Sequence, residues 1–482
     1  MSLFPFQPLA LEFAVLVLGL FILLLEAFLD EKDKRVYAWS GISGLSIVFL
    51  LSFFVAGQPE NAPLDGLWGF YSADFLALFF KRFALLTTIV VLVMAVEYRK
   101  TITDGVAGAG NPAGFAEYVA LPIITCAGLM WMASAVDFIM VFVALELVTI
   151  TFYILVAYMR RNNASLEAGI KYLVLGALST GFLVYGITWI YGMTGQTNFA
   201  MIASVLAGGE VLETPLLFGV LLVLSGLAFK VAAFPFHIWV PDVYQGAPTP
   251  TTAFLSVGSK AAGFVVLLRV VEMLSGVPDV QSRVLGVVAV LAALTLLFGN
   301  LAAMPQNNLK RLLAYSSIAH AGFLLMAVAA MSGRAVSFYL AGYLLMTLAS
   351  FLIMILVARQ TGSDDIASFR GLNEKSPFLA FAMLLAMVSL AGLPFTVGFL
   401  GKFFVFAAAV REQLWLLIAV GILGVGAGFY YYLKVVRAMY WQPADDAQAI
   451  DVGVLPKFTL AALCALILVL GVWPEPVLAM LR

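Results

Sequence analysis

Long apolar runs recur along the whole chain, and they constrain its fold more than any other feature of the sequence. A helix needs about 20 predominantly apolar residues to cross the hydrocarbon core of a bilayer. Hydrophobic residues make up 63% of the chain and charged residues only 11%, whereas soluble domains carry about 25% charged residues. The sequence therefore predicts an integral membrane protein built from membrane-spanning helices.

We predict an all-α, polytopic membrane protein with about fourteen transmembrane helices. A shorter apolar segment, residues 197–208, is expected to lie as an interfacial helix before the seventh span. The N-terminal residues show no positive n-region and no small-residue cleavage site, so the first apolar run is interpreted as a retained span. The predicted spans are residues 9–29, 36–56, 74–96, 116–135, 137–159, 167–191, 214–237, 250–275, 284–304, 309–331, 335–358, 377–410, 413–437 and 456–480.

The basic residues of the loops fall mainly on one side of these spans. Fourteen lysines and arginines lie in one set of loops and four in the other. Because basic loops favour the cytoplasmic side, this bias predicts that both termini lie outside. The fourteen are Lys32, Lys34, Arg35, Arg99, Lys100, Arg160, Arg161, Lys310, Arg311, Arg359, Arg370, Lys375, Arg437 and Lys457, and the four are Arg283, Arg334, Arg411 and Arg482.

The charge and the cysteine content exclude several classes of function. A net charge of -1 provides no basic field for nucleic acid. Cys126 and Cys464 are the two cysteines of the chain, whereas an iron–sulfur cluster takes four ligands. His237 and His320 have no metal-ligand spacing around them. We therefore expect no cofactor and no metal on this chain, and any redox chemistry that it serves must occur on another chain.

Two proline-containing breaks suggest an internal repeat. Residues 227–263 combine two lysines, a histidine, an aspartate and four prolines between apolar runs. Within them, FKVAAFPFH of the seventh span has a counterpart in SLAGLPFTVGFLGKF of the twelfth. Because five is odd, repeating a unit of five spans inverts it, so we predict two inverted five-helix repeats with discontinuous helices 7 and 12. Two unrelated proline kinks are the alternative.

The repeat divides the chain into four parts. We expect an N-terminal three-helix segment at residues 1–115, a first repeat of spans four to eight at 116–275, a second repeat of spans nine to thirteen at 276–440, and a last span at 441–482. Proline removes an intrahelical hydrogen bond and clashes with a preceding carbonyl. The breaks thus free carbonyl groups that need water or a cation, and a nearby lysine ammonium can be that cation.

Ionisable side chains inside membrane spans are costly and are functional candidates by default. Removal from water disfavours the charged form of a lysine, and histidine titrates near neutral pH. We therefore predict a chain of proton-holding sites linked by water. Lys171 follows Glu146 by one loop and could reach it, or it could pair with Glu167 one turn earlier. The predicted proton-holding residues are Glu146, Lys230, Lys260, His320 and Lys402.

Other charged residues of the spans are expected to be structural. Lys81 and Arg82 lie within about two turns of the outer surface, where long side chains can snorkel. Glu12, near the start of the first span, is expected to be interfacial. Arg269 and Glu272 have the spacing of an ion pair on one helix face.

Three motifs resemble a known family of membrane subunits. They are KVAAFPFHIWVPDVYQGAPTPTTAFLSVGSKAAGF, LKRLLAYSSIAHAGFLL and SLAGLPFTVGFLGKF. With them the chain resembles, over essentially all its spans, the subunit N family of the bacterial proton-translocating NADH:quinone oxidoreductase, respiratory complex I. Subunits of multisubunit cation/proton antiporters are similar in the lysine-before-Pro-Phe-His core, but usually lack the continuation of the first motif.

The resemblance implies one of several antiporter-like subunits of a membrane arm in the bacterial inner membrane. NADH, FMN, iron–sulfur clusters and quinone would be bound by partner subunits. The partners would be other membrane-arm subunits, the lipid bilayer and the transported protons. A cation/proton antiporter subunit without redox coupling is the alternative, and a purely structural spacer is a third reading.

The resemblance also implies roles for individual residues. In that family a glutamate of span five and a lysine of span seven form a pair whose opening drives proton movement, and these match Glu146 and Lys230. The lysines of spans six, eight and twelve match Lys171, Lys260 and Lys402.

Overall fold

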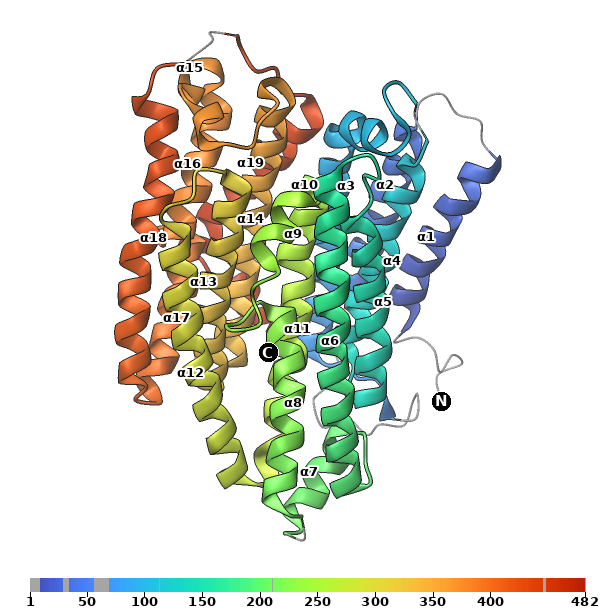
Figure 1. Cartoon of the computed structure of the whole chain (residues 1–482), viewed down its shortest axis with the longest axis vertical. Coiled ribbons are helices and arrows are strands. Elements are labelled where there is room, and N and C mark those ends of the chain that lie inside the picture. The colour runs from blue at the N-terminus through green and yellow to red at the C-terminus, as the bar shows by residue number, and fades with distance from the viewer. Residues whose placement is uncertain are drawn as a thin grey trace.

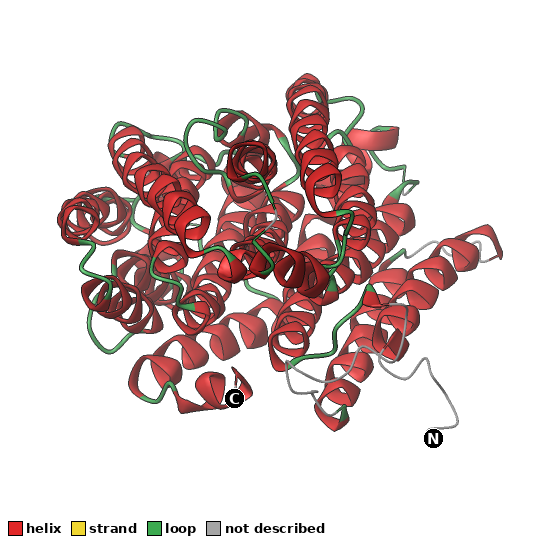
Figure 2. Cartoon of the chain, turned by 90° about the horizontal axis from the view of Figure 1, so that it is seen from below, coloured by secondary structure: helices red, strands yellow, loops and turns green. Residues whose placement is uncertain are grey.

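The computed structural model describes residues 9–28, 34–55, 69–111, 113–209, 211–444 and 448–481, and these ranges consist of helices joined by loops, with three isolated β-bridges. The predicted all-α class is confirmed. The long helices run roughly along the vertical axis of Figure 1, and the view from below in Figure 2 shows many of them end-on. The predictions that concern the N-terminal residues 1–8, Lys32 and Arg482 lie outside the described residues.

Thirteen helical spans of the described chain are long and apolar enough to cross a bilayer. A fourteenth span consists of two shorter helices in series, α16 (Pro377–Ala391) and α17 (Val397–Arg411). The thirteen are α1 (Ala10–Phe28), α2 with η2 (Arg35–Leu51, Ser52–Phe54), α3 (Phe75–Ala107), α4 (Phe115–Ser134), α5 (Phe138–Val156), α6 (Asn163–Thr194), α8 (Glu213–Val231), α10 to η5 (Thr249–Gly276), α12 (Pro278–Ala303), α13 (Leu309–Ala329), α14 (Gly333–Thr361), α18 (Trp415–Trp441) and α19 (Val454–Val472).

The remaining helical elements are short. The expected helix at residues 197–208 is present as α7. The short elements are α7 (Phe199–Ala207), α9 (Val240–Gly246), η6 (Ile366–Phe369), α15 (Leu372–Lys375), α20 (Glu475–Leu478) and η7 (Ala479–Leu481).

Several long helices begin where a polar side chain caps the free backbone N–H groups of the first turn. Asp74 accepts a hydrogen bond of 2.7 Å from the Ala77 N–H at the start of α3. Asp137 does the same for Ile139 at the start of α5, also at 2.7 Å. Such caps satisfy donors that have no partner within the helix. These polar residues therefore decide where the apolar runs become helical.

The seventh and twelfth membrane spans are discontinuous, as predicted. The seventh span was expected to reach residue 237, but α8 ends at Val231, and its cap Ala232 has a φ of 67°. The reason is Pro235, whose ring clashes with the carbonyl four residues earlier and lacks an N–H. Likewise Pro394 follows the end of α16, and α17 begins only at Val397.

Span eight has no break, but it contains a π-helical turn that the sequence did not predict. Between α10 (Thr249–Phe254) and α11 (Lys260–Met273) lies η4 (Leu255–Ser259), one turn of π-helix. Such turns insert an extra residue into a helix and are frequent at functional sites. The π-helical turn ends directly before Lys260 and thus sets the direction of that side chain.

The two broken spans have opposite orientations, as an inverted repeat requires. In Figure 1, α8 lies below α9, whereas α16 lies above α17. Five spans separate the two breaks, and an odd number reverses the direction of the second unit. The division of the chain at residues 115, 275 and 440 stays a prediction.

Burial differs strongly between the spans. The apolar part of the α10–α11 span is buried throughout, and α13 and α14 nearly so, whereas α1 and α6 are mostly exposed on their apolar faces. The helices that carry Lys260 and His320 therefore lie in the interior of the molecule.

Glycines allow α6 and α8 to approach closely. A Cβ atom added at Gly186 would lie 2.5 Å from the carbonyl oxygen of Gly219 and 2.7 Å from the backbone nitrogen of Val223. A Cβ atom added at Gly226 would lie 2.8 Å from the Cβ of Leu183. Small residues at helix contacts let backbones pack directly, which is a main source of stability in membranes.

We predict that Gly186→Ala destabilises the protein, because backbone atoms of α8 cannot move aside for the new methyl group. Overpacking of this kind costs about 1–3 kcal/mol. The unfolding temperature of the purified assembly should fall. Gly181→Ala is the matched control, since the same helix leaves its Cβ position open, and equal temperatures for the two variants would contradict the packing argument.

Candidate functional site

The six predicted site residues all lie in described helices. Lys230 on α8, Lys260 on α11, His320 on α13 and Lys402 on α17 are buried. Glu146 on α5 is partly buried. The sixth predicted residue, Lys171 on α6, lies apart from these five.

Glu146 and Lys230 are each held by a threonine. The Thr180 hydroxyl donates to Glu146 Oε1 at 2.9 Å, and Lys230 Nζ donates to Thr149 Oγ1 at 2.8 Å. Thr149 follows Glu146 by three residues on α5, so the two share a helix face. Glu146 lies close enough for its charge to act on Lys230.

A small cavity lies between these groups. Thr149, Thr180 and Lys230 line it together with residues of α5, α6 and α8. It has room for about one water molecule. One water bound there would have polar partners on both sides, namely the Thr180 that binds Glu146 and Lys230 itself.

Lys260 donates to a neutral acceptor. Its ammonium contacts the backbone carbonyl and the hydroxyl of Ser317 on α13, and lies 5.5 Å from the centre of the Tyr343 ring. The same Ser317 hydroxyl is 3.2 Å from the hydroxyl of Tyr244. A carbonyl, a hydroxyl and a ring face thus contact the ammonium, and the Tyr244 hydroxyl adjoins it through Ser317.

His320 lies between two tyrosine hydroxyls. Nδ1 is 2.7 Å from Tyr339 Oη and Nε2 is 3.0 Å from Tyr432 Oη. A neutral imidazole donates at one nitrogen and accepts at the other, and each hydroxyl can take either role. Lys260 and Lys402 both lie close enough for their charges to act on the ring.

Lys402 is bound to the end of a broken helix. Its ammonium donates to the carbonyl oxygens of Leu390 at 3.0 Å and Ala391 at 2.7 Å, and lies 5.2 Å from the centre of the Phe323 ring. The C-terminal carbonyls of a helix carry partial negative charge. The expectation that a lysine serves the freed carbonyls is confirmed at this break.

The first break uses different partners. Lys230 donates to Thr149 instead of a carbonyl, and the carbonyl oxygen of Phe229 accepts from the indole N–H of Trp239 at 3.2 Å. The expectation is therefore wrong for Lys230, because its side chain leaves the last turn of α8 toward α5, away from the break.

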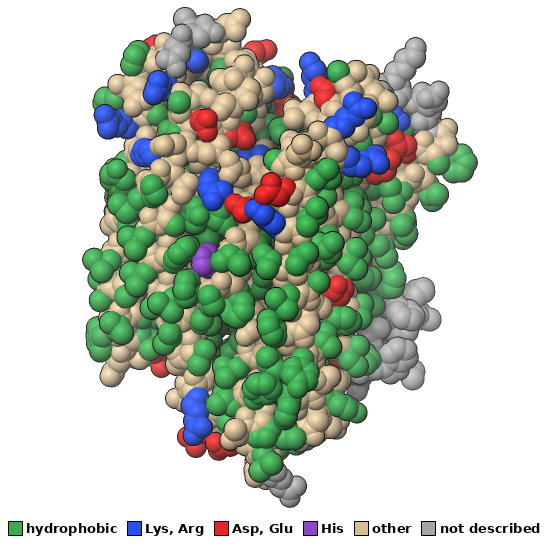
Figure 3. Space-filling model, viewed as in Figure 1, with side chains coloured by type: hydrophobic (Ala, Val, Ile, Leu, Met, Phe, Trp, Pro, Cys, Tyr) green, Lys and Arg blue, Asp and Glu red, His purple; other side chains and the backbone are tan. Residues whose placement is uncertain are grey.

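Lys171 is not brought to Glu146. Its ammonium lies 2.8 Å from Glu167 and 2.7 Å from Asp242, and Asp242 is also bound by Arg311 at 3.0 Å. Lys171 precedes Thr180 by nine residues on α6, or about 13 Å along the axis. Of the two alternatives in the sequence, the structure selects the ion pair with Glu167. Figure 3 shows basic and acidic side chains side by side above the centre of one face.

Two other expectations from the sequence need correction. Lys81 does not snorkel, because it is 2% exposed and lies 2.9 Å from Glu12, which is fully buried and not interfacial. Arg269, which was expected to pair with Glu272, donates to Asp74 at 2.9 Å.

Sequence reasoning missed the hydroxyl partners of the site. Serine, threonine and tyrosine are unremarkable in membrane helices, and their hydroxyls often bond to their own helix, as Thr149 does to the Leu145 carbonyl at 2.6 Å. Paired hydroxyl residues such as Ser316–Ser317 and Tyr431–Tyr432 are the one available signal. Among the described residues, no group of three or more His, Cys, Asp or Glu could hold a metal ion.

The chain is similar to a family of membrane subunits. Residues 135–427 match the family model described as NADH:quinone oxidoreductase/Mrp antiporter, TM. The chain is 38% identical over 477 residues to NADH-quinone oxidoreductase subunit N of Desulforamulus reducens, covering 98% of this chain and 96% of that protein. It is 38% identical over 486 residues to the subunit N of Thiobacillus denitrificans, covering 99% and 97%.

Solved structures show the same fold. A chain of respiratory complex I from Thermus thermophilus with bound aureothin superposes with a TM-score of 0.80 at 31% identity, covering 97% of this chain and 98% of that one. The archaeal membrane-bound sulfane sulfur reductase gives 0.86 at 24% identity, with 98% and 96% covered. The Mrp complex from Dietzia sp. gives 0.81 at 22%, with 100% and 96% covered. The last two likenesses concern the fold alone.

We predict that Lys402→Met lowers the stability of the protein. Methionine keeps the packing over Phe323 but leaves the carbonyls of Leu390 and Ala391 without a donor, at about 1–3 kcal/mol for a buried group without a partner. The measurement is the unfolding temperature of the purified assembly. Lys100→Met is the matched control, since Lys100 is an exposed lysine on α3, and an equal effect of both changes would count against the capping role.

Proposed function

Because this chain belongs to the family of NADH:quinone oxidoreductase and Mrp antiporter membrane subunits, we propose that it is the proton-translocating subunit N of an NADH:quinone oxidoreductase. The relatives that match nearly its full length carry that name, which favours redox coupling over cation/proton antiport. Its partners are then other membrane-arm subunits, including further antiporter-like ones. NADH, FMN, the iron–sulfur clusters and quinone bind to those partners.

The location follows from the same proposal. The chain crosses the bacterial cytoplasmic membrane with both termini outside, supported by the basic residues of one set of loops. Co-purification with chains that bind NADH and iron–sulfur clusters tests this assignment, whereas co-purification with small membrane proteins alone would favour the antiporter.

The observation that carries the function is a row of ionisable groups held by neutral partners. Glu146 is bound by a threonine, Lys230 by another, and Lys260 by a serine. An ammonium that donates to a hydroxyl or carbonyl can lose its proton without leaving a carboxylate unpaired in the membrane. The row therefore supports reversible proton binding better than a set of buried ion pairs would.

We place the first step at Glu146 and Lys230. The Glu146 carboxylate attracts the Lys230 ammonium and stabilises its protonated form. A charge change beside Glu146 that draws it away makes the ammonium more costly. Lys230 then releases its proton into the cavity that it shares with Thr149 and Thr180.

The next group along the row is Lys260. The stem of Lys230 packs against α11 at Gly263, where an added Cβ atom would lie 3.3 Å from Lys230 Cγ. Gly263 follows Lys260 by one helical turn, so both lysines serve the same part of the interior. Water between them would complete the transfer.

The second half of the row leads through His320 to Lys402. The Tyr432 hydroxyl contacts both His320 and Ser316, and Ser316 adjoins the Ser317 that holds Lys260. A proton accepted at one nitrogen of His320 and released at the other crosses the ring without moving the side chain. Lys402, one helix away, is the last proton-holding group of the row.

We predict that Lys230→Ala slows proton translocation in the assembled complex by about 100-fold or more, since a positioned proton-transfer group contributes roughly that much. NADH-driven acidification of proteoliposomes measures it, with uncoupled NADH oxidation as the check on assembly. Lys100→Ala, at an exposed lysine, should leave the rate unchanged. Native-like pumping by Lys230→Ala would remove this lysine from the mechanism.

We also predict that Thr149→Val slows translocation by roughly tenfold. Leaving a charged donor without its partner costs about 1.5–3 kcal/mol, and 1.4 kcal/mol corresponds to a factor of ten. Thr149→Ser keeps the hydroxyl and should retain most of the rate in the same assay. Equal rates for valine and serine would show that the hydroxyl has no part in the step.

A further inference from the structure

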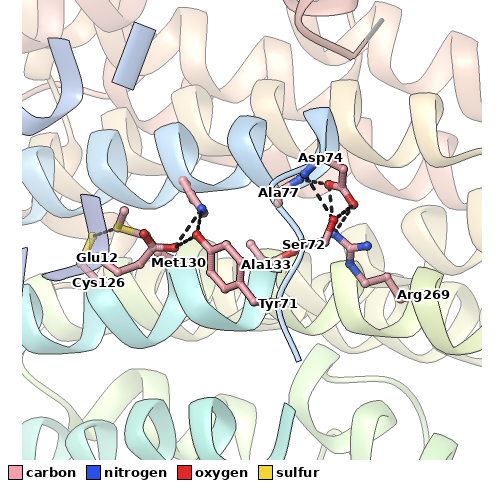
Figure 4. A network of polar contacts seen from close by, with 10 residues as sticks. Glu12, Tyr71, Ser72, Asp74, Ala77, Cys126, Met130, Ala133 and Arg269 are labelled. Atoms are coloured by element: carbon pink, nitrogen blue, oxygen red, sulfur yellow. Dashed lines mark hydrogen bonds and ion pairs between the residues drawn. The ribbon is translucent and has the colours of Figure 1, made fainter. Parts of the chain in front are cut away.

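A second buried carboxylate–lysine pair joins α1 and α3, away from the row described above. Glu12 Oε1 lies 2.9 Å from Lys81 Nζ, and the two side chains are 0% and 2% exposed. The Tyr71 hydroxyl donates to Glu12 Oε1 at 2.9 Å and accepts from the Lys81 ammonium. Figure 4 shows the Tyr71 hydroxyl and the Glu12 carboxyl group directed toward each other. Three groups that can bind or release a proton therefore meet at one buried point.

One oxygen of this cluster has no partner. Glu12 Oε2 is buried and makes no hydrogen bond in the described chain, while Oε1 carries both contacts. A buried carboxylate oxygen without a donor is unfavourable, and protonation removes the unfavourable charge. The Glu12 carboxyl group, to which the Tyr71 hydroxyl donates at Oε1, is therefore a position where a proton can be held.

The neighbouring charged side chains, Asp74 and Arg269, are each held by more than one partner. Asp74 is bound by Arg269 at 2.9 Å and by the Ser72 hydroxyl at 3.0 Å, and Arg269 also donates to the Ala133 carbonyl at 3.0 Å. Arginine does not lose its proton in proteins, so Arg269 cannot serve as a proton donor here. Cys126 on α4 is a further titratable group, and it lies near enough to Glu12 for the glutamate charge to act on the thiol.

A short segment connects the two pairs. Tyr71 belongs to the first and Ser72 and Asp74 to the second, and Figure 4 shows them on one stretch of chain that passes between the helices. Arg269 lies nine residues after Lys260 on α11, about 13 Å along the helix. One end of α11 thus carries a lysine of the proposed proton row, and the other end lies beside the segment that carries Tyr71. The Asp74–Arg269 contact shows this neighbourhood and takes no part in the proposed transfer.

A purely structural role does not explain the choice of residues. Replacing a buried ion pair by apolar residues of similar size is often neutral or stabilising, so such a pair is weak evidence for a stabilising function. An intramembrane ionisable residue is instead a functional candidate. The Glu12–Lys81–Tyr71 cluster contains the same two charged residue types as the Glu146–Lys230 arrangement.

We propose that Glu12, Lys81 and Tyr71 form a proton-exchange site of this chain, at the end of α11 remote from Lys260. The Lys81 ammonium passes a proton to the Tyr71 oxygen, while the Tyr71 hydroxyl proton moves to Glu12. One N–H and one O–H bond break and two O–H bonds form, which leaves a neutral amine, a phenol and a carboxylic acid with no change in net charge. A water molecule that then accepts the Glu12 proton and carries it away as hydronium makes the step a net release, and it leaves a Glu12 carboxylate beside a neutral Lys81 amine. The inference rests on the proposed function for its proton source.

The test is a double-variant cycle in the intact complex in proteoliposomes. Glu12→Gln and Lys81→Met each leave one buried charge unpaired, so both should lower the unfolding temperature, whereas the double variant removes both charges and should regain stability. We expect the double variant to be as stable as the native protein but at least about tenfold slower in NADH-driven proton translocation. A structural clamp predicts recovery of both properties, and that result would overturn the proposal.

A neighbouring ion pair provides the control. The double variant Asp74→Asn/Arg269→Met removes a buried ion pair that we assign no proton exchange, and asparagine retains the cap on α3. It should translocate protons at the native rate once assembled. Equal slowing by both double variants would mean that any disturbance of this region matters, and would also overturn the proposal.

A second readout does not depend on the stability of the double variant. Tyr71→Phe removes only the hydroxyl through which the proton passes, and should slow translocation at least about tenfold with the ion pair intact.

Redox-triggered infrared difference spectra should contain a protonated-carboxyl band that Glu12→Gln abolishes. A native rate with Tyr71→Phe together with no such band contradicts the inference. If the complex pumps normally with Lys230→Ala, Lys230 has no part in the proposed row. If it does not pump with Lys230→Ala but pumps normally with the Glu12/Lys81 double variant, the row stands and this inference alone fails.

Discussion

Every charged or unpaired polar group inside a membrane protein must find its partner within the protein, and this constraint organises the whole molecule. It is most direct at Lys402, where the ammonium binds two carbonyls at the end of α16. The proline break creates acceptors that no longer have a helical donor, and the buried lysine is a cation that needs acceptors. Each satisfies the other, so the break and the buried charge are one structural unit. Close packing elsewhere, as between α6 and α8, has another origin, since helices in lipid associate through direct van der Waals contact between small residues.

Cations on the membrane-spanning helices bind two chemical kinds of partner. Lys230, Lys260 and Lys402 donate to hydroxyls or carbonyls, whereas Arg269 and Lys171 bind carboxylates. The first kind of contact persists when the lysine is neutral, because an amine still donates to an oxygen. The second kind loses its main attraction when either partner is neutralised. Contacts of the first kind suit proton transfer, and contacts of the second kind suit holding helices together. The Glu12–Lys81 pair is an exception, since Lys81 binds a carboxylate within the proposed proton-exchange site.

The inverted repeat produces similar breaks without identical chemistry. Lys230 precedes its break and turns toward α5, while Lys402 follows its break and turns back to α16. Between them, α11 and α13 lie in the interior and present Lys260 and His320. The row of ionisable groups therefore crosses both repeats, and the most enclosed helices lie at its centre.

The sequence by itself determined the membrane class, the number of spans, the breaks at Pro235 and Pro394 and the buried ionisable residues, because each depends on local composition or on proline geometry. Only the tertiary structure decided the partners. Lys171 and Asp242 are 71 positions apart, and Lys230 and Thr149 are 81 apart, and such pairings depend on how helices rotate and pack. Hydroxyl residues carry no distinct pattern, so the groups that hold the lysines, like the π-helical turn before Lys260, could not be predicted. The burial of Lys81 against Glu12 was missed for the same reason, since the depth of a side chain depends on the neighbouring helices that cover it.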